Sequence, residues 1–203
     1  MANLGNCMLF YLKYAAEMER LYEAEKPKEE GLPKPDQILE KIKLVGDTAN
    51  REVAEFLEFC ALGIEAHFHA ISDVKRVRNN LEKTWGLDFW VGPKDATDRR
   101  IEIGVNIDSN LVALIPWIWC RGGRRAEDEM VRIMGGRIKH CKSPGWESSG
   151  TVVLDEIKIS LPARLEDSVE CDSLVAQVRH AFAAFTEQDI AAIDGIASNR
   201  GEA

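Results

Sequence analysis

The chain has 203 residues, of which 45% are hydrophobic, and a net charge of −8 at neutral pH. This length allows one domain with a core that needs no disulfide bridges, and the acidic balance argues against binding nucleic acid or an anionic membrane by overall charge. Five widely spaced cysteines indicate free thiols in a reducing compartment, and no signal peptide or membrane-spanning apolar run is evident. We therefore expect a cytoplasmic protein without membrane contact.

Helical periodicity dominates the N-terminal half. Apolar residues recur at intervals of three and four over 6–25, and a charged, proline-bearing stretch follows. We expect a second helix from Asp36 to Leu44 that Gly46-Asp47 ends, and then a long helix running to about Thr84. The middle of the long helix, 56–68, is apolar on more than one face. This pattern favours burial by other elements, or a homodimer formed through the long helix.

The clearest alternation of apolar and polar residues lies between Arg99 and Arg125. Four β-branched residues at every second position from Ile101 to Ile107 predict a strand with one buried face. Asp108-Ser109-Asn110 supplies turn chemistry, and Leu111 to Trp119 is the predicted return strand, apolar on both faces. Pro116 cannot donate to a strand ladder and suits an edge or a bulge, so we expect the strand to bend there.

A glycine-hinged basic cluster follows this hairpin directly. It consists of Arg121, Arg124 and Arg125 around two glycines, and it is preceded by Trp117 and Trp119. Arginine and tryptophan are the residue types most enriched in interface hot spots, which makes this loop the candidate binding surface. The more frequent roles of these residue types are solvated surface for arginine and core packing for large aromatics.

The C-terminal part combines a strand with helices. A short helix is predicted from Ala126 to Met134, and a strong strand from Thr151 to Leu161, with Val153, Asp155, Ile157, Ile159 and Leu161 on one face. Thr186-x-x-Asp189 has the spacing of a capping box that starts a last helix.

The order of these elements predicts an α+β fold. We expect a helical N-terminal half packed on a small, mainly antiparallel β-sheet, with C-terminal helices. We divide the chain into an N-terminal helix and charged linker (1–35), a single α+β domain (36–198) and a disordered tail (199–203).

A second function class rests on Asp108, Glu156 and Lys158. Glu156 and Lys158 are two apart in the predicted strand and share a face, an arrangement in which the carboxylate holds a divalent metal ion and the lysine orients water. With Asp108 as the upstream acid, this fragment resembles the PD-(D/E)xK nuclease core, and the resemblance implies a metal-dependent nuclease. The same residues also fit the polar outer face of a half-buried strand, which we prefer.

Other residue combinations give weaker signals. Glu65 and His69 are four apart on the long helix but lack further metal ligands, and Cys120, His140 and Cys141 cannot all share one strand face. Cys60 or Cys120 as a nucleophile would need a histidine brought in by the fold. Our first hypothesis is a non-enzymatic protein-binding module of the inhibitor or adaptor type, without a cofactor. Nucleic acid is a less favoured partner, and nothing in the sequence supports a small-molecule cleft.

Overall fold

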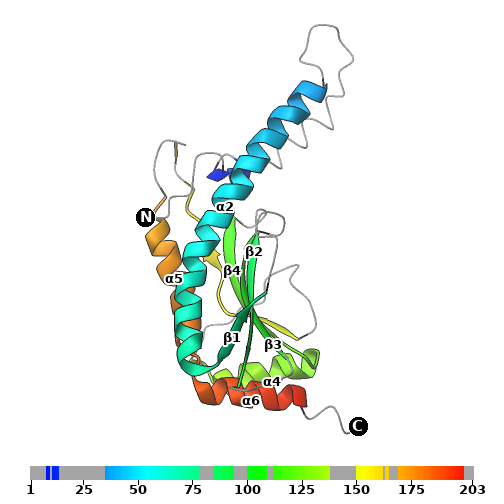
Figure 1. The fold of residues 1–203 in the computed structure, drawn as a ribbon, viewed down its shortest axis with the longest axis vertical. Coiled ribbons are helices and arrows are strands. Elements are labelled where there is room, and N and C mark those ends of the chain that lie inside the picture. The colour runs from blue at the N-terminus through cyan, green and yellow to red at the C-terminus, as the bar shows by residue number, and fades with distance from the viewer. Residues whose placement is uncertain are drawn as a thin grey trace.

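The computed structural model describes residues 8–9, 11–13, 35–77, 85–93, 100–108, 112–137, 150–161, 163–164 and 169–198, and for 35–45 the backbone alone. Its elements are α2 (Pro35–Ile71), β1 (Asp73–Arg76), β2 (Gly86–Gly92), β3 (Ile101–Asp108), β4 (Ala113–Cys120), α4 (Arg124–Met134), β5 (Thr151–Val153), β6 (Ile157–Lys158), α5 (Cys171–Ala183) and α6 (Glu187–Ser198) (Figure 1). The fold is α+β, and the six strands form one antiparallel sheet, as the sequence predicts.

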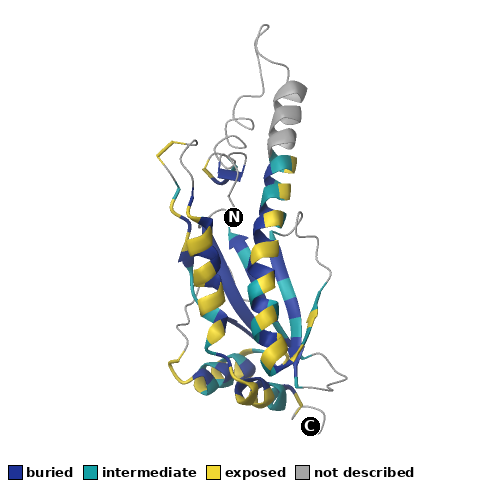
Figure 2. Ribbon diagram, turned by 60° about the vertical axis from the view of Figure 1, so that its left-hand side comes forward, coloured by how far each residue is buried: buried dark blue, intermediate teal, exposed yellow. Residues whose placement is uncertain are grey.

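The described helices share one core with one face of the sheet. Helices α2 and α5 lie side by side along the strands, whereas α4 and α6 pack against each other at the lower end of the sheet (Figure 1). Ile101, Ile103 and Val105 of β3 are fully buried in this core. Figure 2 shows the inner sides of α2 and α5 buried against the sheet and their outer sides exposed. In the described part of the chain, no helix is apolar enough over a sufficient length to cross a membrane.

The predicted hairpin is present at the centre of the sheet. Strands β3 and β4 pair over their full length, from Ile101 opposite Cys120 to Asp108 opposite Ala113. The strand order is β1-β2-β3-β4-β5, with β6 also paired to β4. Strand β4 is therefore an inner strand, buried on both faces as its apolar sequence predicts.

The prediction of one continuous strand from Thr151 to Leu161 is wrong. The segment forms the short strands β5 and β6, and the three residues 154–156 between them lie opposite only two residues of β4, Ile115 and Pro116. The extra residue is a β-bulge, which moves later side chains to the other face of the sheet. Val153 and Ile157 consequently belong to separate apolar clusters rather than to one face. The proline thus lies beside a bulge of the neighbouring strand, which is where a residue without an N–H is tolerated.

Two expectations for the N-terminal half are also corrected. Helix α2 continues through Gly46-Asp47 without a break and ends at Ile71, well before Thr84. One internal glycine costs only about 1 kcal/mol of helix stability, which tertiary packing outweighs here. At the other end, Val74 leaves the helical pattern because it pairs with Val91 of β2 and packs on the core. Apolar residues three apart, such as Ile71 and Val74, fit a continuing helix as well as a turn into a strand. The periodicity of the sequence alone therefore misplaced the end of α2.

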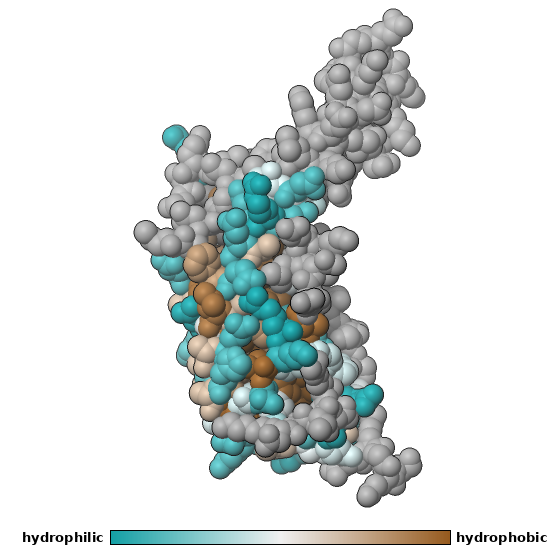
Figure 3. Space-filling model, viewed as in Figure 1, coloured by the Kyte–Doolittle hydropathy of each residue, from teal (hydrophilic) through white to brown (hydrophobic). Residues whose placement is uncertain are grey.

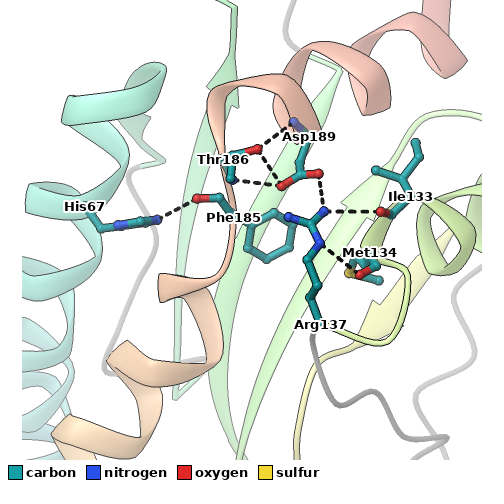
Figure 4. A network of polar contacts seen from close by, with 7 residues as sticks. All are labelled: His67, Ile133, Met134, Arg137, Phe185, Thr186 and Asp189. Atoms are coloured by element: carbon teal, nitrogen blue, oxygen red, sulfur yellow. Dashed lines mark hydrogen bonds and ion pairs between the residues drawn. The ribbon is translucent and has the colours of Figure 1, made fainter.

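A polar network fixes the junction between the C-terminal helices (Figure 4). The predicted capping box is present, because the Thr186 amide and hydroxyl donate to Asp189 Oδ2 over 2.9 and 2.7 Å. The other carboxylate oxygen of Asp189 forms an ion pair with Arg137, which also donates to two carbonyls in the last turn of α4. His67 of α2 lies 3.2 Å from the Phe185 carbonyl. Three helices are thereby connected at one point.

Candidate functional site

The basic loop, residues 121–125, consists of the turn after β4 and the first two residues of α4, and it has a defined backbone. Gly122 and Gly123 have φ angles of 146° and 66°, which side chains other than glycine rarely adopt. Two backbone hydrogen bonds hold the start of the loop. The Cys120 amide donates to the Gly150 carbonyl over 3.0 Å, and the Arg121 amide donates to the carbonyl of Arg100, the residue that precedes β3. Arg121 is therefore presented from a fixed turn, and Arg124 and Arg125 from the first turn of α4.

The three arginines of this loop add positive charge to the surface, and Arg132 and, to a smaller extent, Arg125 lower the pKa of the nearby Glu129. Arg121, Arg124 and Arg125 are all exposed. Within the residues that the structure describes, none of them forms an ion pair. The arginines that do pair with acidic side chains of the chain are Arg76, Arg100, Arg132 and Arg137. Folding thus leaves three guanidinium groups, each suited to bidentate contact with a carboxylate, facing solvent.

The two tryptophans near the loop have different positions. Trp117 is 9% exposed, its ring N–H donates to Asn106 Oδ1 over 2.9 Å, and it covers Gly104 of β3. This is the core position that the sequence favoured for a large aromatic. Trp119 is half-buried, lies opposite Glu102, and stands two residues before Arg121. Of the two, Trp119 adjoins the basic loop.

The residues of the nuclease hypothesis meet at the other end of the sheet. Asp108 and Lys158 both lie opposite Ala113, one on each neighbouring strand, so their side chains are on the same face with Cα atoms roughly 10 Å apart. Glu156 forms an ion pair with Lys158. In the described ranges, no group of three His, Cys, Asp or Glu side chains is placed to hold a metal ion.

A pair of carboxyl groups lies on the sheet face opposite the main core, where sequence analysis proposed no site. Glu102 stands between Trp90 and Trp119 in a row across the strands, and it is hydrogen-bonded to Asp88 of β2. Burial, this hydrogen bond and the Asp88 charge together raise the pKa of Glu102 to about 7. The pair therefore holds one proton close to neutral pH, which is the protonation state that a general acid needs. This pair could not be found from the sequence, because it depends on the register between β2 and β3.

The buried thiols are poorly suited to nucleophilic chemistry. Burial raises the pKa of Cys60 to about 12, although the Arg179 charge opposes it, and burial with the Asp194 charge raises the pKa of Cys120 to about 11. Both thiols stay protonated at neutral pH, whereas a nucleophilic cysteine needs the thiolate.

The remaining candidate ligands are engaged elsewhere or lie outside the described residues. Glu65, the acid of the Glu65–His69 pair, contacts Arg76 over 3.2 Å. His140 and Cys141 of the proposed cysteine–histidine group fall outside the described ranges.

Comparisons of the chain with protein-family models, with curated proteins and with solved structures gave no significant match.

Proposed function

We propose that the protein is a non-enzymatic binding module that captures an acidic surface of a partner protein through the basic loop 121–125. The observation that carries the proposal is the clustering of three exposed arginines within five residues, none of them in an ion pair among the described residues. Arg51, Arg164 and Arg179 are also exposed, but each lies on a separate part of the fold. Such an excess of positive charge on a protein of net charge −8 supports an external role for it.

The arrangement favours a carboxylate-rich partner. Arginine makes paired, planar hydrogen bonds to carboxylates, and it is among the residues that dominate interface energetics. Trp119 at the base of the loop adds a half-buried aromatic beside the charges. Because the chain as a whole is acidic, a partner of uniform negative charge would be repelled outside this loop, which favours a protein with a local acidic patch over nucleic acid.

The test is purification of the tagged full chain from its host, analysing co-purified protein and nucleic acid, in wild type and two triple variants. Replacing Arg121, Arg124 and Arg125 with alanine is expected to weaken the binding of a stoichiometric protein partner at least 100-fold. The matched control replaces three exposed bases elsewhere, Lys75, Arg132 and Arg164, and makes the same change in net charge. The control is expected to retain the partner, with affinity that falls as salt rises.

Equal loss of the partner in both triple variants would reduce the effect to overall charge and contradict the proposal. Retention of the partner by the loop variant would contradict it as well. Recovery of nucleic acid without a protein partner would favour the second candidate.

That second candidate is a metal-dependent nuclease, supported by the row that places Asp108 and Lys158 on one face with Glu156 beside the lysine. It predicts cleavage of DNA or RNA in the presence of Mg²⁺ or Mn²⁺, and a loss of at least 100-fold in the Glu156→Gln variant. The exposed Glu187→Gln on α6 is the control and is expected to cleave like the wild type. Absence of metal-dependent cleavage in the wild type, or full activity of Glu156→Gln, would reject it.

A further inference from the structure

The outer face of α2 is apolar where a solvent-facing helix is normally charged. Phe59 and Leu62 are 41% and 60% exposed and are the large hydrophobic side chains that stand out on the described surface. Ala66 and Ala70 continue the same exposed stripe toward the end of the helix. In Figure 3 hydrophobic atoms form a strip along the left edge of the molecule, where α2 and α5 lie in Figure 1. We name these four residues the α2 stripe.

Charged and polar side chains flank the stripe at both ends. Arg51 and Glu55 are exposed before it, and His69 is exposed next to its last residue, Ala70. The spacing of two of them about Leu62 is symmetrical. Glu55 and His69 are each seven residues from it on α2.

This symmetry makes the face complementary to itself. When two α2 helices lie antiparallel with a twofold axis at Leu62, helical residues that are equally far from Leu62 come opposite each other. Glu55 then faces His69, which can donate a hydrogen bond to the carboxylate. Nearer the axis, Phe59 faces the small side chain of Ala66, and Leu62 meets its own symmetry mate. A twofold interface requires this kind of reciprocal matching.

We infer that the α2 stripe binds a second copy of this chain, forming an antiparallel homodimer whose twofold axis passes beside Leu62. The reciprocal match of Glu55 with His69, and the small Ala66 opposite the large Phe59, support a second copy as the occupant over an unrelated protein. The exposed Ala176 and Ala183 lie on the adjacent α5, with Arg179 between them in the sequence reaching Gly63 of α2. The inference does not depend on the basic loop, which lies at the start of α4.

Sedimentation equilibrium of the full chain over 1–100 µM is the first test. The wild type is expected to have twice the 22.8 kDa mass of one chain at the upper concentrations. Leu62→Glu is expected to weaken dimerisation at least 100-fold, because two carboxylates would meet in an apolar contact. Ala191→Glu on the exposed side of α6 is the matched control and is expected to dimerise like the wild type. A monomeric wild type, or an unchanged dimer of Leu62→Glu, would overturn the inference.

Two further measurements test the register. Glu55→Arg and His69→Glu are each expected to weaken the dimer about threefold at low salt, and their combination to restore it, because the charges are exchanged across the interface. Leu62→Cys is expected to form a disulfide-linked dimer under mild oxidation, whereas Ala191→Cys is expected to stay at the level of the wild-type background. No rescue by the double variant, or no crosslink through position 62, would reject this register even if the protein dimerises.

Discussion

Replacing Gly104 with alanine is expected to destabilise the fold by about 2 to 4 kcal/mol and to lower Tm by roughly 5 to 15 °C. A Cβ at this position would lie 2.5 Å from Trp117 Cζ2 and 2.6 Å from the Leu87 carbonyl oxygen. Neither atom can move freely. The Trp117 ring is held by its hydrogen bond to Asn106, and Leu87 is part of the β2 backbone that pairs with β3.

Gly195→Ala is the matched control for this substitution. Gly195 lies in α6, and no atom comes within 4 Å of the position that its Cβ would take. Alanine there is expected to stabilise the protein by about 0.5 to 1 kcal/mol, because it lowers the conformational entropy of the unfolded chain and has a higher helix propensity than glycine. Thermal and urea unfolding followed by tryptophan fluorescence measure both changes. Wild-type stability of Gly104→Ala would mean that Trp117 does not cover this strand.

The stability of the wild type is expected to fall by about 1 to 2 kcal/mol as pH rises from 4.5 to somewhat above 7. The cause is Glu102, whose pKa in the folded protein is raised to about 7 from an ordinary value of 4.5 by burial and by Asp88. Between these two values the folded protein keeps a proton that the unfolded chain has released. The stabilisation is thus complete below pH 4.5 and is lost as pH rises through the folded pKa. Solvent reaches half-buried Glu102, which reduces the magnitude.

Glu102→Gln removes this titration, because the amide stays neutral. The variant is expected to have nearly the same stability at pH 5 and pH 8, and to exceed the wild type at pH 8. Asp128→Asn, at an exposed position of α4, is expected to leave the wild-type profile unchanged. Urea unfolding at several pH values measures the slope. A slope in Glu102→Gln as steep as in the wild type would assign the pH dependence to other groups.

The elements predicted correctly are those set by interactions between residues close in sequence, and the errors arise where distant parts of the chain interact. The β3–β4 hairpin, α4 and the capping box at Thr186 rest on neighbours within a few residues, and their patterns were predicted correctly. The bulge at 154–156 depends on the strand that lies beside Pro116, far away in the chain. The end of α2 at Ile71 depends on pairing between β1 and β2. Local periodicity cannot contain such long-range causes.

The same division applies to the candidate sites. The loop arginines and their glycine turn are adjacent in sequence, so their cluster could be found by inspection, and the capture of a protein partner by it stays a prediction. The sequence could not indicate that these arginines lack ion pairs when four others have them. The Asp88–Glu102 pair joins two strands and requires the register to be known.

The edges of the sheet limit how this protein can associate with other chains. One edge is β1, four residues long, with Lys75 and Arg76 on it. The other is divided by the bulge into β5 and β6, of three and two residues. Long, regular edges serve as templates for aggregation and for added strands, whereas short, charged or interrupted edges resist both. In the described part of the sheet, backbone pairing with another chain is therefore disfavoured, and recognition has to come from side chains.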